Sequence, residues 1–416
     1  MPEATKIQAQ TTGEDASLIE TGIHNSLFKK RPHRAATDYA IQEKKYIFRP
    51  LITTGSELVA EIHKEGTLLR DITLVLRAPA LTGLVTGAPT YARYGDFGGL
   101  QCLNRDVPIT FEYGSTNVHR VYTDQIYSQY FYQSNEDRAV SEHLIGGERT
   151  PAERNTLALA TQEFRIPIPT PWEGCGNELK ICALASNLRI RFPLASAKAA
   201  IQTDGTKPEN FNYVEAYLRY ELVHMPGVDR EEIANATFSQ TGEFTLFTDV
   251  IRKDFTIPAD AMFNAQNIYG YGIDLKDATG TVRNMSGFIR DSTAFDPNLP
   301  NPAPYEVNPA YLKNLTFSIR ANDRVLFEET RPNFEQVEQV SRLYGCSPDV
   351  GQFHAYWDML PLDTHFATGH LSLANFSSGT LYLRSAISHP EVRVTLLVVR
   401  WNWTNQKNGN YQRIWN

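Results

Sequence analysis

Long runs in which apolar and polar residues alternate constrain this chain more than any other feature of its sequence. The longest cover residues 67–77, 214–223 and 392–401. A period of two places every second side chain on the same face of a β-strand, so each run predicts a strand with one buried face. Few windows keep the 3.6-residue period of an amphipathic helix. The sequence therefore predicts a mainly β protein.

Composition supports this prediction and limits the partners. The 416 residues include 20 Tyr and 21 Phe, side chains that suit strands and interfaces better than helical bundles. Hydrophobic residues make up 42% and charged residues 21%, as in ordinary globular chains. The net charge is −7, which argues against broad nucleic-acid binding. No sequence-specific nucleic-acid contact is expected.

Strand-like features of the first half recur in the same order in the second half. The hairpin at 109–122 has a counterpart at 315–327, and each is followed by a predicted short helix, at 123–131 and 333–340. The later pairs are 166–168 with 360–362, 179–184 with 370–376, 188–192 with 380–383, and 214–223 with 392–401. Agreement in the order of these features indicates an internal duplication.

About eight short strands in each half, separated by Gly, Pro and Asn turns, match the strand count of a jelly roll. The predicted fold is two tandem eight-stranded jelly-roll sandwiches, a double jelly roll, with long loops and an extended N-terminal arm. The long loops are placed at 80–105, 133–160 and 275–310. The predicted division is arm 1–40, first jelly roll 41–226, connector 227–241, second jelly roll 242–404 and C-terminal tail 405–416.

The cysteine spacing and the N-terminal sequence argue against a metal site, a secretion signal and a membrane helix. The four cysteines follow no metal-binding spacing, so free thiols are expected at Cys102, Cys175, Cys182 and Cys346. The N-terminus has no apolar core of a secretion signal, and no apolar run reaches the length of a membrane helix. The five glycosylation sequons are therefore interpreted as chance matches: Asn235, Asn284, Asn314, Asn375 and Asn402.

Motifs of catalysis are missing from the sequence. It contains no nucleophile elbow, phosphate-binding loop, HExxH or dinucleotide fingerprint. His354, His365 and His370 lack the spacing of a cupin metal site, and Asp358 and Asp363 are interpreted as loop caps. We therefore predict no catalytic, cofactor-binding or metal-binding residue, and no enzymatic activity.

Four tryptophans next to strand ends leave two interpretations open. Trp172, Trp357, Trp401 and Trp403 fit core or interface anchors, and they also fit a platform on which sugars stack. A carbohydrate-binding protein or a cupin-like metal enzyme on a duplicated sandwich is accordingly the alternative function.

One basic run, residues 29–34 with the sequence KKRPHR, lies in the N-terminal arm. It could contact phosphates or lipid headgroups, or it could be a solvated loop or dock on a neighbouring subunit.

A duplicated sandwich with large loops and no catalytic motif indicates an assembly protein. Three such chains would place six similar sandwiches in one pseudo-sixfold block that tiles a surface.

Several segments, taken in order, resemble the major capsid proteins of the double jelly-roll lineage, particularly those of large eukaryotic DNA viruses of phycodnavirus and iridovirus type. The similar segments are the aromatic and basic arm at 28–40, the hairpin at 109–122, the apolar-Pro-apolar-Pro strand at 164–172, the strand and acidic-basic stretch at 217–232, and the Thr-Gly signature from Ala367 to Leu383. Ser372 and Ala374-Asn375 depart from that signature, and the chain is shorter than many members of the family, chiefly in the loops. These departures leave open which lineage the chain resembles, and the capsid protein of a smaller virus, such as a virophage or polinton-like virus, is the alternative.

The resemblance implies a structural protein that forms homotrimeric, pseudo-hexameric capsomers in an icosahedral virion shell. It implies neighbouring capsomers and minor capsid or penton proteins as partners, and an internal membrane near the N-terminal arm. It places the protein in the virion, assembled in the infected host cell, with the long loops outward.

Overall fold

The structure is a computed structural model that describes residues 39–130, 133, 135–147, 150–172, 178–238, 242–263, 270–275, 280–305, 309–322, 324–329, 352–356, 371–372 and 378–414. Several predictions lie outside these residues: most of the N-terminal arm, the helix at 333–340, the strand at 360–362, most of 370–376, and the side chains of Cys175, Cys346, Trp357, Asp358, Asp363, His365, His370 and Asn375.

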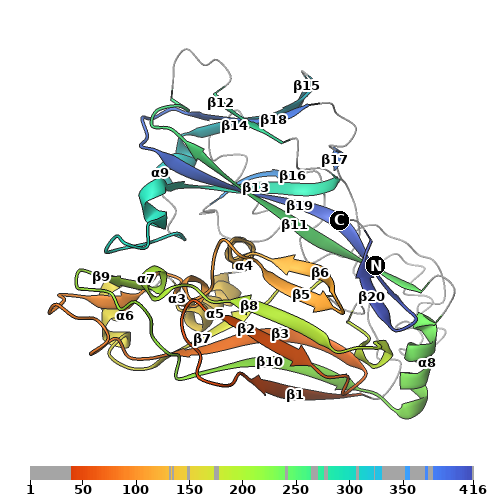
Figure 1. Ribbon diagram of the computed structural model, residues 1–416. Coiled ribbons are helices and arrows are strands. Elements are labelled where there is room, and N and C mark those ends of the chain that lie inside the picture. Colours follow the sequence, from red (N-terminus) through yellow and green to blue (C-terminus); the bar gives the residue numbers. More distant parts are fainter. Residues whose placement is uncertain are drawn as a thin grey trace, which may run out of the picture.

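Strands from the first half of the chain form two antiparallel four-stranded sheets, which we call the first sandwich (Figure 1). The sheet orders are β1-β10-β3-β7 and β2-β8-β5-β6. Their bounds are β1 (Ala40–Ile47), β2 (Glu57–Ile62), β3 (Leu68–Ala78), β5 (Ile109–Tyr113), β6 (Thr116–Val121), β7 (Gln162–Pro167), β8 (Leu188–Pro193) and β10 (Glu215–His224). A small ribbon, β4 (Ala92–Tyr94) with β9 (Ile201–Thr203), lies beside them.

Strands from the second half form the second sandwich, above the first in Figure 1. Its sheets have the orders β11-β19-β13-β16 and β12-β18-β14-β15, and β17 and β20 extend the former. The bounds are β11 (Glu243–Ile257), β12 (Tyr271–Asp274), β13 (Thr281–Asp291), β14 (Leu315–Ala321), β15 (Arg324–Glu329), β16 (Phe353–Tyr356), β17 (Leu371–Ser372), β18 (Gly379–Ser385), β19 (Val392–Lys407) and β20 (Asn410–Arg413).

The two sandwiches have the same strand order. β14, β15, β18 and β19 occupy the places of β5, β6, β8 and β10, as the matched sequence features predict. In each sandwich the remaining four strands also correspond in order along the chain. The strand that takes the place of β7 is β16, which precedes the segment predicted for it. The internal duplication is thereby confirmed at the level of sheet topology.

Helices of the described residues are short and lie in connections between strands. They are α3 (Gly98–Gln101), α4 (Thr123–Tyr130), α5 (Asn135–Ile145), α6 (Pro151–Leu157), α7 (Ala197–Ala200), α8 (Gly227–Thr237) and α9 (Pro309–Lys313), with 3-10 turns η1 (Ile181–Ala183) and η2 (Ser292–Phe295). α4 confirms the predicted helix after the first hairpin. Among the described residues, no helix combines the length and apolarity that crossing a bilayer requires.

The prediction that 133–160 is a loop is wrong, because α5 and α6 lie within it. α6 begins with a capping box in which Thr150 and Glu153 satisfy each other's backbone N–H groups, and Pro151 takes the first helical position. These are sequence signals for a helix start, so α6 could have been predicted.

The prediction that 275–310 is a loop is also wrong, because β13 runs through it. Both faces of β13 are covered, one by the second sandwich's own core and the other by the first sandwich. The second of these faces is partly polar and carries Ser286, Phe288 and Arg290. A strand covered on both faces does not show the simple apolar-polar alternation used to find strands.

Two smaller corrections concern the first sandwich. The predicted strand at 179–184 is the 3-10 turn η1 with a single bridge from Leu179 to Leu69. No strand is predicted at Glu57–Ile62, where the structure has β2. In β2 the pattern ELVAEI alternates, but its exposed side contains Val59, so the apolar periodicity is blurred.

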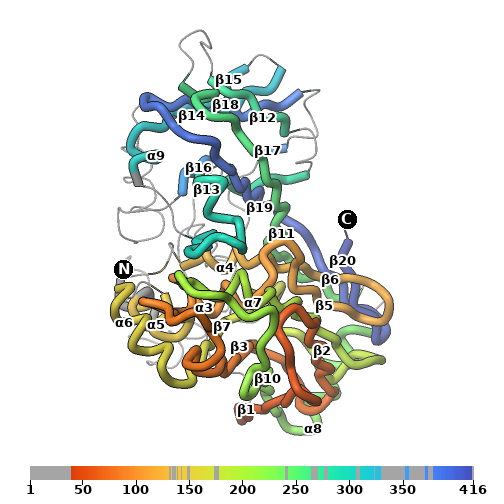
Figure 2. Tube along the Cα trace, turned by 60° about the vertical axis from the view of Figure 1, so that its left-hand side comes forward, coloured from red at the N-terminus to blue at the C-terminus, as the bar shows by residue number. Residues whose placement is uncertain are grey.

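The sandwiches share part of one hydrophobic core. The cluster that fills the first sandwich also includes side chains from second-half segments: Val250, Phe288, Tyr305, Leu397 and Tyr411. Figure 2 shows α4, β11 and β20 at the level where the sandwiches meet. Long strands β11 and β19 therefore belong to the second sandwich and also cover the first.

The two ends of the molecule differ. At the left end in Figure 1 the connections are long and contain α3, α5, α6 and α7. At the right end lie α8 and the turn between β19 and β20, next to the start of β1. The molecule thus has a loop-bearing end and a turn-bearing end.

Candidate functional site

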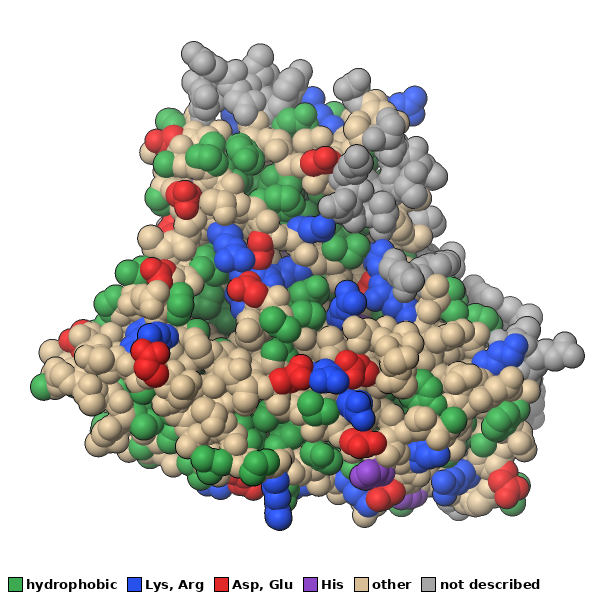
Figure 3. Space-filling view, viewed as in Figure 1, with side chains coloured by type: hydrophobic (Ala, Val, Ile, Leu, Met, Phe, Trp, Pro, Cys, Tyr) green, Lys and Arg blue, Asp and Glu red, His purple; other side chains and the backbone are tan. Residues whose placement is uncertain are grey.

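Polar side chains of the described residues gather at the junction between the sandwiches, where Figure 3 shows basic and acidic groups at the waist of the molecule. We call seven of them the Arg–Asp lattice: Arg105, Asp106, Asp124, Arg252, Asp254, Arg290 and Arg393. The first three belong to the first half of the chain and the other four to the second. The lattice is therefore a contact between sandwiches.

Asp124 is the fully buried centre of the lattice. It lies in the first turn of α4, where the positive end of the helix dipole favours a carboxylate. Its carboxylate forms ion pairs with three guanidiniums: Arg290 at 3.0 Å, Arg252 at 2.9 Å and Arg105 at 3.1 Å. Arg252 and Arg290 come from β11 and β13, so one side chain of the first half is held by two strands of the second.

Asp254 forms a second node on β11. Its carboxylate pairs with Arg105 at 3.1 Å and with Arg393 at 2.7 Å, and Thr395 donates to it at 2.7 Å. Asp106, which is 67% exposed, closes the rim through Arg252 and Arg393. Arg105 thus bridges Asp124 and Asp254 and ties the two nodes together.

The lattice changes the acidity of its members. Burial alone raises the pKa of Asp124, but Arg105, Arg290 and Arg252 outweigh it and lower the pKa. For Asp254, burial again opposes ionisation, yet the same kind of charge pairing lowers the pKa to about 2. Burial of Arg290 lowers its guanidinium pKa despite the attraction of Asp124. Both carboxylates therefore remain charged well below neutral pH.

Aromatic rings cover the excess positive charge. The guanidiniums of Arg105 and Arg393 lie 4.5 and 4.7 Å from the centre of the Phe295 ring. The Arg290 guanidinium lies 4.5 Å from the Phe288 ring and 5.3 Å from the Tyr127 ring. A ring face offers negative potential to a cation that has lost part of its water shell.

A second junction contact lies at the loop-bearing end. Lys207 of the first half donates to three carbonyl oxygens, those of Lys198 at 3.0 Å, Pro297 at 2.9 Å and Leu299 at 2.6 Å. The segment 296–305 of the second half also accepts from the Thr203 N–H, at the Pro300 carbonyl, at 2.9 Å. These bonds hold the proline-rich segment 296–305, which we call the strap, against β9.

A third junction contact lies at the turn-bearing end, where the β19–β20 turn inserts into the first sandwich. Tyr113 donates to the Gly409 carbonyl, which also accepts from the Ala185 N–H at 2.7 Å. Gly409 has φ of +77°, and a Cβ there would lie 2.9 Å from the Ala185 Cβ. Glycine is therefore required by both backbone angle and space.

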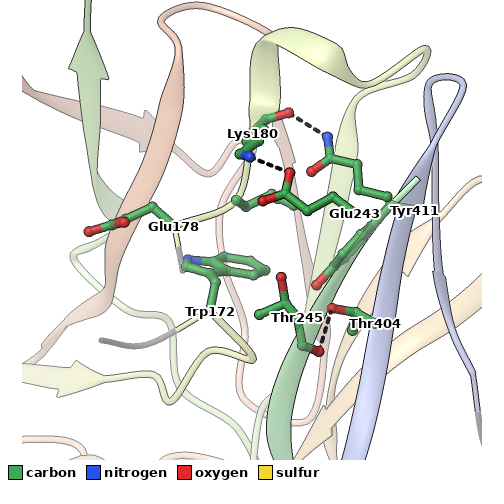
Figure 4. Close-up of a pocket in the computed structure, with 9 residues that line it drawn as sticks. Trp172, Glu178, Lys180, Glu243, Thr245, Thr404 and Tyr411 are labelled. Atoms are coloured by element: carbon green, nitrogen blue, oxygen red, sulfur yellow. Dashed lines mark hydrogen bonds and ion pairs between the residues drawn. The ribbon is translucent and has the colours of Figure 1, made fainter. Parts of the chain in front are cut away.

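Next to this turn is a small cavity walled by both halves of the chain (Figure 4). Trp172 and Tyr411 lie on two sides of it, and Lys180 and Glu243 form an ion pair at its rim. Its volume is about 10 Å³, which is room for a single water molecule. The cavity is part of the junction and is too small for a sugar or a cofactor.

The tryptophans and the histidine that were candidates from the sequence, and that the structure describes, are buried or half-buried. Trp172 and Trp401 are 3% and 4% exposed, and the Trp172 indole donates to the Arg70 carbonyl at 3.3 Å. Neither can serve as a sugar platform, and Trp403 is half-buried. His354 is fully buried in β16, where burial lowers its pKa to about 3. Within the described ranges, no group of three His, Cys, Asp or Glu could hold a metal ion.

Other predicted features also have a structural explanation. Cys102 and Cys182 are free thiols, as predicted, and burial raises the pKa of both. Asn284 and Asn402 are buried in β13 and β19, which closes these two sequons to glycosylation.

Comparisons by sequence find nothing: no family model and no curated protein matches this chain. Comparison of structures finds capsid proteins. Vp54 of PBCV-1, solved as a crystal structure fitted into a reconstruction of the virophage Sputnik, is 13% identical, with a TM-score of 0.71 over 94% of this chain and 100% of that one. The fold is the double jelly roll of viral major capsid proteins.

Other viruses provide further examples of this double jelly roll. The Faustovirus major capsid protein is 10% identical and has a TM-score of 0.65, with 97% of each chain covered. A chain of the Sputnik virophage structure is 9% identical and has a TM-score of 0.54, with 95% of this chain and 92% of that chain covered. The predicted fold and the predicted resemblance are thereby confirmed over nearly the whole chain.

Sequence reasoning missed the Arg–Asp lattice. Its members stand far apart along the chain, and each is an ordinary charged residue in or near a strand or turn. The available signal was the pair Arg252 and Asp254, opposite charges two residues apart in a strand and therefore on one face. A solvated face would show the same pattern, so the burial could not be predicted.

Proposed function

We propose that this chain is the major capsid protein of an icosahedral virus, and that three copies form a pseudo-hexameric capsomer. The observation that supports this best is the duplication: two sandwiches of identical strand order are joined side by side in one chain. Three copies arranged about a threefold axis present six similar sandwiches, which approximates sixfold symmetry and permits close tiling.

The three junction contacts support a rigid building block. A shell needs subunits of fixed shape, because each interface between neighbours must recur many times. The lattice, the strap at Lys207 and the inserted turn at Gly409 fix the second sandwich on the first near both ends and at the centre. This arrangement supports a structural role rather than catalysis, so we propose no enzymatic activity and no cofactor.

The polarity of the molecule supports an orientation in the shell. We place the loop-bearing end outward and the turn-bearing end, where β1 begins, toward the virion interior. The N-terminal arm at 1–40 would then lie near an internal membrane or minor proteins, with its basic run available to acidic groups. We also retain as proposals the division at 41–226, 227–241, 242–404 and 405–416, and the partnership with neighbouring capsomers and penton proteins.

The proposal is tested by the oligomeric state of the purified full chain. Size-exclusion chromatography with light scattering should give three times the 47.0 kDa chain mass, and negative-stain images should show flat, pseudo-hexagonal particles. The trimer should persist on dilution, as an obligate interface does. A chain that stays monomeric at high concentration would contradict the proposal.

A further inference from the structure

Two sandwiches of the same fold raise a question of pairing. During folding and assembly, a first sandwich could dock on the first sandwich of another copy instead of on a second sandwich. The shared strand order does not distinguish these alternatives. A chain that must avoid them needs features that differ between the two docking faces.

The two faces of the junction carry opposite net charge in the Arg–Asp lattice. The first-half members are one arginine and two aspartates, a net charge of −1: Arg105, Asp106 and Asp124. The second-half members are three arginines and one aspartate, a net charge of +2: Arg252, Asp254, Arg290 and Arg393. Each face is thus incomplete alone and complementary to the other.

We propose that the Arg–Asp lattice determines pairing specificity, so that a first sandwich docks stably only on a second sandwich. The buried positions enforce this rule. Asp124 is 0% exposed, and docking of two first sandwiches would bury two such carboxylates without the guanidiniums of Arg252 and Arg290. Docking of two second sandwiches would bury arginines without Asp124. A buried charge without its partner is strongly disfavoured.

This inference rests on the proposed function, because a capsomer of three copies holds six sandwiches that must alternate. It concerns a different property, however. The oligomeric state of the wild-type chain tests the capsomer, whereas the outcome of refolding charge variants tests the pairing rule.

The test compares two double variants of the full chain. Asp124→Asn with Arg290→Met removes one charge from each junction face, which leaves a net charge of 0 on the first face and abolishes the opposition of sign. Glu112→Gln with Arg191→Met is the control. It removes a half-buried pair with an N–O distance of 2.8 Å, and both residues belong to one sheet of the first sandwich, on β5 and β8.

Each chain is diluted from denaturant and separated by size-exclusion chromatography with light scattering. Wild type and control are expected to refold to the same single species. For the junction variant, the yield of that species is expected to fall roughly tenfold, and the rest of the chain should elute as heterogeneous oligomers. The reason is that loss of one opposed charge pair lowers the discrimination between correct and incorrect docking on the order of tenfold. Cross-linking between labelled and unlabelled copies should then join first-half lysines that remain unlinked in the wild type.

Two results would overturn the proposal: the junction variant refolds to the wild-type species with the wild-type cross-links, or the control variant loses as much of it. If the junction variant yields no folded protein, Arg393→Gln decides. Arg393 is 26% exposed, so this variant weakens the second face without leaving a fully buried charge. It should give a smaller loss in the same direction, and an unchanged species would count against the proposal.

Discussion

His119 is a buried imidazole at the boundary between the sandwiches. It lies on β6, with its ring centre 5.6 Å from that of Phe111 in the first sandwich and 5.5 Å from that of Phe247 on β11. Burial lowers its pKa to about 4, against a smaller raising effect of Asp249. The imidazole is therefore neutral in the folded protein at pH values where the unfolded chain is protonated.

We predict that stability falls as the pH drops through this window. The unfolded pKa is about 6.5, so below it the unfolded chain binds a proton that the folded protein refuses until about pH 4. His119 should lower the free energy of unfolding by about 3 kcal/mol over that range. Urea unfolding from pH 7 to pH 4 should show this slope, and His119→Phe should remove that part of it.

The control for this prediction is His63→Gln, at an exposed position beside Asn187. It should retain the wild-type slope. A His119→Phe chain with an unchanged slope would place the pH dependence elsewhere, for example at the buried His354, whose pKa is also lowered by burial.

Gly287 provides a second prediction for a single residue. It lies on β13 opposite Phe353, and a Cβ there would lie 2.2 Å from the Phe353 ring. Phe353 is buried in the second core and cannot move aside. Gly287→Ala should therefore destabilise the protein by about 1–3 kcal/mol in denaturant unfolding. Gly227→Ala, where nothing lies within 4 Å of the added Cβ, should cost nothing.

Among the elements, the β19–β20 hairpin has the clearest energetic consequence. Tyr411 of β20 is buried in the first core, 6.5 Å from the ring centres of Tyr113 and Trp172. Tyr411→Ala should cost about 3–5 kcal/mol, as large aromatic truncations in cores do. Phe244→Ala, at a 49% exposed position on the neighbouring β11, should cost less than about 1 kcal/mol.

Hydrogen exchange can locate the effect of Tyr411→Ala. Protection should decrease in the first sandwich around Ala185 and Tyr113, which contact the hairpin turn, as well as in β20. A decrease confined to the second sandwich would show that the hairpin does not stabilise the first.

Elements differ in how well the sequence predicted them, and the differences have physical causes. Strands whose second face is partly exposed, such as β3 and β10, follow the alternation rule and were predicted. β13 was missed because the first sandwich covers its second face, and that contact is set by tertiary structure. α6 was missed although its capping box is a local signal. The Arg–Asp lattice depends wholly on packing between distant segments, so only the structure reveals it.

For the whole molecule, the shared core and lattice predict one cooperative unit. Calorimetric unfolding of the full chain should give a single transition, because neither sandwich retains its core or its charge partners when the other unfolds. Equality of the calorimetric and van't Hoff enthalpies would support this. Two resolved transitions would show that the sandwiches unfold independently.

The duplication could be predicted at this scale, while the relation between the copies could not. Matched segments along the chain indicate two similar sandwiches, and the sheet orders agree. Their mutual placement depends on single side chains such as Asp124 and Lys207, which no period or motif marks. The proposed function could be inferred from the sequence only through the resemblance, because a role in assembly leaves no catalytic signature in a sequence.

β11 reverses its contacts along its length. Near its start Phe247, an odd-numbered position, reaches His119 of the first sandwich, whereas further on the even-numbered Val250, Arg252 and Asp254 face it. The twist of a fifteen-residue strand allows such a change of side. Deleting a single residue near Thr248 would move the following side chains to the opposite face of the strand. Arg252 and Asp254 would then point into the hydrophobic core of the second sandwich. The length of this strand is therefore as tightly constrained as its composition.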